Sequence, residues 1–113
     1  MANPNRGEVS VRVGDDEWKF SFSVNALCEL EDCLDRPVPQ IVASLGDTDN
    51  LRISDVRAIV WAALLDKHEG ISLTEAGDVA SKVGTLVCLE KVGKALDLAF
   101  PAKGSKNPRK AKG

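Results

Sequence analysis

The run from Ala26 to Leu34 constrains the fold most, because it combines a helical repeat with a position directly after an alternating segment. Leu27, Leu30 and Leu34 recur at the spacing that places them on one stripe of a helix. The acidic residues of the run fall largely off that stripe. The run therefore predicts an amphipathic helix that packs against a core, and not a catalytic centre.

Residues 8–22 precede this helix and alternate apolar and polar side chains on both sides of the turn-forming segment 14–17. Trp18, Phe20 and Phe22 fall on one face of the second alternating stretch. This pattern predicts a β-hairpin with one apolar face. A two-stranded sheet is marginal alone, so we expect helices to cover that face.

Helical periodicity, capping residues and glycine or proline stops predict five helices, at about 24–34, 39–45, 55–68, 73–83 and 85–100. Ser23 or Asn25 could cap the first helix, and Ser54 could cap the third. The third helix is apolar over more than half of its circumference, which predicts that it forms the centre of the core. In the last helix the residues expected to face inward are Leu86, Leu89, Val92 or Gly93, Leu96, Ala99 and Phe100.

Together these elements predict an α+β fold, in which an N-terminal β-hairpin packs on a cluster of four to five α-helices. A single domain is expected over residues 8–100. Residues 1–7 are expected to be a flexible N-terminus, and residues 101–113 a basic, disordered tail.

Few residues are suited to acid-base or nucleophilic catalysis, since the chain has one histidine and no tyrosine. His68 lies near a predicted helix end and is interpreted as a solvated residue. The carboxylates of residues 29–35 belong to one short segment and are interpreted as a solvated acidic face. No phosphate-binding glycine motif or calcium loop is present. We therefore expect no enzyme activity, no catalytic residues, no cofactor and no metal.

The three cysteines are Cys28, Cys33 and Cys88. Cys28 and Cys33 lie about 140° apart around a helix, so they do not face one site. We interpret all three as small, reduced residues without a redox or metal role. The N-terminus lacks an apolar signal segment, and the apolar stretch 58–65 is too short to span a bilayer, so a cytoplasmic location without membrane contact is expected.

Charge is distributed unevenly, since residues 1–100 carry a formal charge of −7 and residues 101–113 carry +5. Five cations without interleaved aromatic residues give only salt-sensitive attraction to phosphates, and the acidic body opposes that attraction. Nucleic acid is therefore not the expected partner. An alternative function remains, a small regulatory module whose basic C-terminal tail contacts nucleic acid.

Several short patterns occur in a characteristic order: Ala-Leu-x-Glu-Leu-Glu-x-x-Leu from Ala26, Ser54-Asp55-Val56, Glu75-Ala76-Gly77, and Ala95-Leu96-x-x-Ala99-Phe100. In this order and spacing the chain resembles the small tail proteins of gene transfer agents and related prophages, which are described as tail tube or tail assembly chaperone proteins. The resemblance covers roughly residues 7–100. The basic tail after Pro101 departs from it.

The resemblance implies a non-enzymatic role in building a phage-like tail. It implies a tail assembly chaperone that binds the tape-measure protein or a tail tube subunit in the bacterial cytoplasm, or a protein incorporated in the phage-like particle. The edge of residues 8–13 could also pair with a second copy of the chain. The residues chosen as candidate partner contacts are Glu31, Trp61, Leu65, Val87 and Lys91. Glu31 could instead cap a helix internally, and Trp61 could instead belong to the core.

Overall fold

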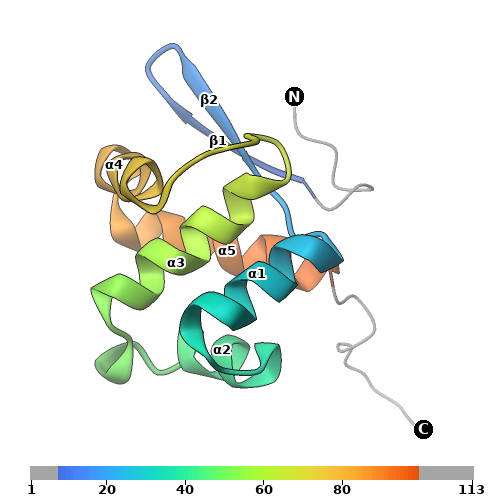
Figure 1. The fold of residues 1–113 in the computed structure, drawn as a ribbon. Helices are drawn as coiled ribbons and strands as arrows, with labels where there is room; N and C mark the ends of the chain where they lie inside the picture. Colours follow the sequence, from blue (N-terminus) through green and yellow to red (C-terminus); the bar gives the residue numbers. More distant parts are fainter. Residues whose placement is uncertain (1–7, 100–113) are drawn as a thin grey trace, which may run out of the picture.

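The computed structural model describes residues 8–99, apart from the side chain of Thr48, so the expected N-terminus 1–7 and tail 101–113 lie outside the described residues. A two-stranded antiparallel hairpin is followed by five α-helices (Figure 1), which confirms the predicted α+β class. The elements are β1 (Val9–Val13), β2 (Asp16–Phe20), α1 (Val24–Leu34), α2 (Val38–Leu45), a single 3-10 turn (Thr48–Asn50), α3 (Ile53–Leu65), α4 (Leu73–Val83) and α5 (Thr85–Ala99).

The hairpin buries one face against the helices, as its alternation predicted. Gly14 opens the turn with φ 60°, a conformation that glycine adopts without a steric penalty. Val11 and Phe20 are buried, and Trp18, which lies opposite Val11 in the register, is half-buried against the same core. Phe22, just beyond β2, is also buried. The hairpin packs on α3, α4 and α5, so it is part of the single core.

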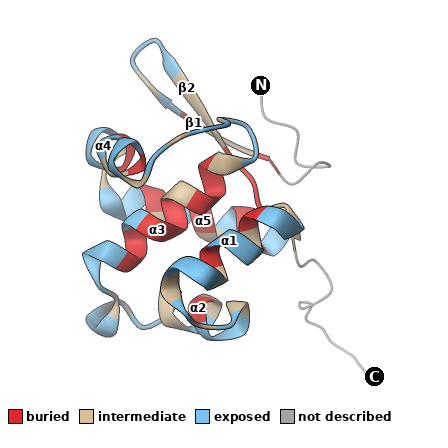
Figure 2. Ribbon diagram, in the orientation of Figure 1, coloured by how far each residue is buried: buried red, intermediate tan, exposed pale blue. Residues whose placement is uncertain are grey.

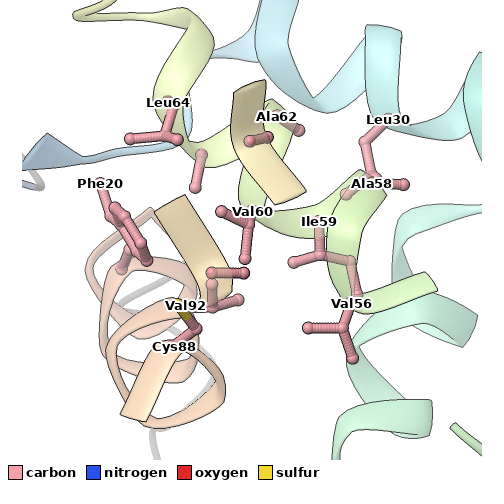
Figure 3. Close-up of a cluster of buried hydrophobic side chains, with 14 of the residues drawn as sticks. Phe20, Leu30, Val56, Ala58, Ile59, Val60, Ala62, Leu64, Cys88 and Val92 are labelled. Carbon is pink, nitrogen blue, oxygen red and sulfur yellow. The ribbon is translucent and has the colours of Figure 1, made fainter. Parts of the chain in front are cut away.

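Helix α3 is the centre of the molecule, in agreement with its broad apolar surface. Figure 2 shows buried residues along most of its length, and α1, α4, α5 and β2 all pack against it. Figure 3 shows Val60 of α3 close to Phe20 of β2 and to Cys88 and Val92 of α5. All four of these side chains are fully buried.

Helix α1 begins at the first of its two candidate caps. The hydroxyl of Ser23 accepts a hydrogen bond from the backbone N–H of Ala26 at 3.1 Å, whereas Asn25 lies inside the helix. The helix ends at Asp35, whose φ of 53° is left-handed. Leu30 is fully buried, and Leu27 and Leu34 pack partly buried against the core, as the leucine stripe predicted.

The predicted start and end of the third helix are wrong. Helix α3 begins after Arg52, and the Asp55 carboxylate accepts a hydrogen bond from the Arg52 N–H at 3.4 Å, so Ser54 is not the cap. The carboxylate is also held by Arg36 at 2.9 Å, which fixes Asp55 in the first turn. The helix ends at Leu65, because residues 66–68 turn away to contact the hairpin.

The inward face of α5 is as predicted at Val92 and Leu96, which are buried, and at Leu89 and Ala99, which pack partly buried against the core. The expectation for Leu86 is wrong, since it is 78% exposed, while Cys88 and Ala95 are also buried; Phe100 lies outside the described residues. Helix α4 begins with the predicted capping box, in which Ser72 and Glu75 exchange hydrogen bonds. Gly84, at φ 102°, is the single residue between α4 and α5, so its backbone sets the direction and rotation of α5.

Candidate functional site

The described residues contain no group of three or more His, Cys, Asp or Glu side chains arranged to hold a metal. The surface has a shallow, open hollow of about 310 Å³ at the end of α1, lined by Glu31, Asp32, Asp35, Arg36 and Pro37. Two of its polar groups already have protein partners, since Arg36 pairs with Asp55 and Glu31 accepts from a backbone N–H. Two of the five lining residues therefore hold the helices together.

Glu31 makes the internal contact that the sequence left as an alternative. Its Oε2 accepts a hydrogen bond from the N–H of Val38 at 2.7 Å. Val38 is the first residue of α2, where N–H groups have no partner inside the helix. Pro39 lacks an N–H, and the N–H groups of Gln40 and Ile41 bond to the carbonyl of Pro37. Glu31 thus completes the cap of α2 and ties it to α1.

Trp61 and Leu65 lie one turn apart on α3, and both are half-buried. The indole N–H of Trp61 donates to the carbonyl of Ile71 at 3.0 Å, and its ring packs against the core. Trp61 therefore connects α3 to the segment that precedes α4. Its contacts agree with the alternative of core packing.

Val87 and Lys91 lie one turn apart on α5. Val87 is 41% exposed and Lys91 is half-buried. The same helical face continues to Lys94, which is exposed, and to Leu98, which is 36% exposed. The spacing of 4, 3 and 4 residues places these four side chains in one line along the helix. We call Val87, Lys91, Lys94 and Leu98 the α5 stripe.

The α5 stripe is the candidate interaction surface that the structure assembles. It has an apolar residue at each end and two lysines between them, and exposed Leu86 adjoins its first residue. Glu31 on α1 and Trp61 on α3 belong to other parts of the fold and do not extend it. Lys94 and Leu98 were missed in the sequence because Val87 and Lys91 were not extended to the next two positions of the helical repeat. The helical repeat of the sequence was the signal that could have found these two residues.

The interpretation of His68 as a solvated residue is wrong. Its Nε2 accepts a hydrogen bond from the N–H of Lys19 at 3.3 Å, and its ring centre lies 5.1 Å from that of Trp18. Burial of the ring, and secondarily the positive charge of Lys19, lowers the pKa of His68 below its ordinary value. The neighbouring residues Asp66 and Lys67 also contact the N-terminal segment, at Ser21 and Glu8 respectively.

The three cysteines are free thiols, but their surroundings differ. Cys28 and Cys33 are exposed on α1, whereas Cys88 is buried between α5 and α3. Burial raises the pKa of Cys88 to about 11, so its thiolate, the reactive form, is scarce at neutral pH. Cys88 acts as a core residue.

Within residues 8–99, no helix combines the length and the apolar character needed to cross a membrane. Comparisons with curated proteins and with solved structures gave no match. The comparison with known protein families matches residues 6–100 to the family described as phage tail tube protein, GTA-gp10. This match spans nearly the whole folded region and confirms the resemblance to gene transfer agent and phage tail proteins. The chain therefore belongs to the GTA-gp10 family of phage tail tube proteins.

Proposed function

We propose that this protein is a non-enzymatic tail assembly chaperone, which binds the tape-measure protein or the tail tube subunit of a phage-like particle during tail morphogenesis. Membership of a phage tail tube family supports a role in a tail. The contact surface itself is argued from α5.

The α5 stripe is the observation that carries the proposal. Its apolar ends, Val87 and Leu98, lie on one face of a regular helix and remain exposed in the isolated chain. An exposed helix face of this kind suits contact with an amphipathic helix of a partner. Lys91 and Lys94 between the ends favour a partner helix that carries acidic residues at the centre of its contact face. A tape-measure protein, as a long helical chain, offers such helices.

Three polar groups that could have served a catalytic site have structural roles in the described residues. His68 and Glu31 both accept backbone hydrogen bonds, and Arg36 is paired with Asp55. These contacts support a protein that acts by binding. The alternative, a regulatory module that contacts nucleic acid, depends on residues 101–113, which lie outside the described residues.

A matched pair of substitutions tests the α5 stripe. Val87→Asp places a charge on the stripe, while Val24→Asp places the same charge on another valine, which is 76% exposed at the start of α1. We expect Val87→Asp to weaken binding of the purified tape-measure protein or tube subunit at least about tenfold, which corresponds to about 1.4 kcal/mol. Val24→Asp should leave the Kd unchanged. Equal effects of the two substitutions, or no effect of Val87→Asp, would remove α5 as the contact surface.

A further inference from the structure

Three consecutive residues after α3, Asp66, Lys67 and His68, bind the N-terminal segment of the chain. Asp66 accepts a hydrogen bond from the Ser21 hydroxyl at 2.9 Å, and Lys67 forms an ion pair with the buried Glu8 at 3.1 Å. His68 accepts the Lys19 N–H at 3.3 Å. We call residues 66–68 the clasp, because they fasten the α3–α4 connection to both ends of the hairpin's base.

The clasp covers the outer edge of β2. In an antiparallel hairpin the pair next to a tight turn is hydrogen-bonded, and hydrogen-bonded pairs then alternate with non-hydrogen-bonded ones. Here the hydrogen-bonded pairs are Val13–Asp16, Val11–Trp18 and Val9–Phe20. The N–H groups of Lys19 and Ser21 therefore point away from β1. Lys19 is bound by His68, and Ser21 is bound by the carbonyl of Ala63 at 2.9 Å.

Only one protonation state of His68 can hold this edge. A neutral imidazole has one nitrogen that accepts, whereas the protonated ring donates from both nitrogens and accepts from neither. Acceptance at Nε2 thus requires the neutral ring with its proton on Nδ1. Lys19 on β2 is the charged residue that contacts His68. Of the charged residues next to His68 in the chain, Asp66 bonds to Ser21 and Lys67 pairs with Glu8, which precedes β1, while Glu69 is exposed. Lys19 disfavours a second positive charge at this place.

Trp18 adds an independent indication that this contact is weakly held. Its indole N–H is buried and has no hydrogen-bond partner in the described part of the chain. An unpaired buried donor is unfavourable. Because the Trp18 and His68 rings are neighbours, with centres 5.1 Å apart, displacement of His68 would change the surroundings of this donor.

We infer that the clasp is acid-sensitive: protonation of the His68 imidazole removes the acceptor of the Lys19 N–H and releases the connection from β2 at that residue. Ser21 stays bound to Ala63, so the hairpin base and the helical core remain folded. The uncovered edge of β2 then has a free backbone N–H, and such edges pair with other extended chains. The protonation state of His68 thus decides whether the Lys19 N–H at this edge is bound.

Hydrogen exchange of single amides in the full-length chain tests the inference by NMR. The chain has one histidine, so the ring signals report His68 directly. As the pH falls from about 7.5 through the His68 titration, the protection factor of the Lys19 amide should fall at least about tenfold, with the midpoint of that titration. The Val60 amide, in the core, should remain far better protected than the Lys19 amide at every pH, because its exchange requires global unfolding.

The variant His68→Gln is the control, because its side-chain amide oxygen accepts a hydrogen bond but does not titrate. Protection of Lys19 in this variant should be independent of pH over the same range. Constant protection of Lys19 through the His68 titration in the natural chain would overturn the inference. Equal protection of Lys19 and Val60 at low pH would overturn it as well, since it would indicate that both amides exchange only through global unfolding. Both of these outcomes are read from the natural chain alone, whether or not the variant folds.

Discussion

Glu31 joins two helices through one hydrogen bond, from the first N–H of α2 to its carboxylate. Glu31→Ala leaves that N–H without its partner and should lower the free energy of unfolding by about 1 kcal/mol, the usual cost of losing a helix cap. Chemical denaturation followed by circular dichroism measures this loss.

Glu29 is the matched control for this substitution. It lies on the same helix and is exposed, and no hydrogen bond or ion pair of its side chain is seen within residues 8–99. Glu29→Ala should change stability by less than about 0.5 kcal/mol. If Glu31→Ala is as mild as Glu29→Ala, the hydrogen bond to Val38 does not contribute in solution.

The lowered pKa of His68 gives the stability of the chain a defined dependence on pH. In the unfolded chain the imidazole takes up a proton around its ordinary pKa of 6.5, whereas in the folded chain it stays neutral to lower pH. The unfolded state thus binds more protons in this window, and stability must fall as pH falls through 6.5. The contribution of His68 to stability is fully present above pH 6.5, and it is fully lost below the pKa of His68 in the folded state.

Denaturation curves at about pH 7.5 and about pH 5.5 measure this dependence, in a range where most carboxylates remain charged. His68→Gln should flatten the change between the two pH values. A natural chain that becomes more stable on acidification would contradict the burial of a neutral His68.

At the scale of elements, Gly84 decides how α4 and α5 are joined. Its φ of 102° is a conformation that side-chain-bearing residues rarely adopt. Gly84→Ala should therefore destabilise the chain by at least about 1 kcal/mol, although no atom lies where the new methyl group would go. The loss would be measured as a decrease in Tm and in the denaturation midpoint.

At Gly93, by contrast, substitution by alanine should raise the stability of the chain. It lies inside α5, and an added methyl group would meet nothing within 4 Å. Gly93→Ala should raise stability by about 0.5 to 1 kcal/mol, because alanine favours the helix more than glycine does. A loss at Gly93, or no loss at Gly84, would show that backbone conformation does not set the stability of these two sites.

The elements themselves were predictable from the sequence, because alternation in the hairpin and helical periodicity elsewhere are strong local signals. The inward residues of α5 were predicted correctly at Val92 and Leu96, but not at the start of the helix. Leu86 is the larger side chain, yet the core takes Cys88, because the backbone of Gly84 rather than residue size sets how α5 begins. His68 was misjudged for a related reason. Its partner, Lys19, is 49 residues away in the chain, and no local pattern reports such a contact.

The candidate site was predictable only in part. Val87 and Lys91 followed from the outer face of the last helix, and the structure extends them to Lys94 and Leu98. Glu31 and Trp61 were ambiguous in the sequence, because a carboxylate or an indole can serve a partner or the fold equally well. Their contacts with Val38 and Ile71 cross the loops that follow α1 and α3, and helical periodicity does not report such contacts.

At the scale of the whole molecule, an acidic folded region carries an exposed helix face with two lysines, and a basic segment follows it. Residues 1–100 hold a formal charge of −7 and residues 101–113 hold +5. If the α5 stripe is the contact surface, partner binding resides in the folded region and does not need the basic segment. A function that depended on nucleic acid would need the basic segment, and its binding would weaken strongly at high salt.

The most direct test of the chaperone proposal is co-expression with the tape-measure protein and the tail tube subunit of the same particle, followed by capture of this chain. Capture should be repeated with a chain that ends at Pro101 and at low and high salt. We expect both chains to retain one of the two tail proteins with little dependence on salt. Failure to retain either protein, or retention that requires residues 102–113 and is lost at high salt, would contradict the proposal.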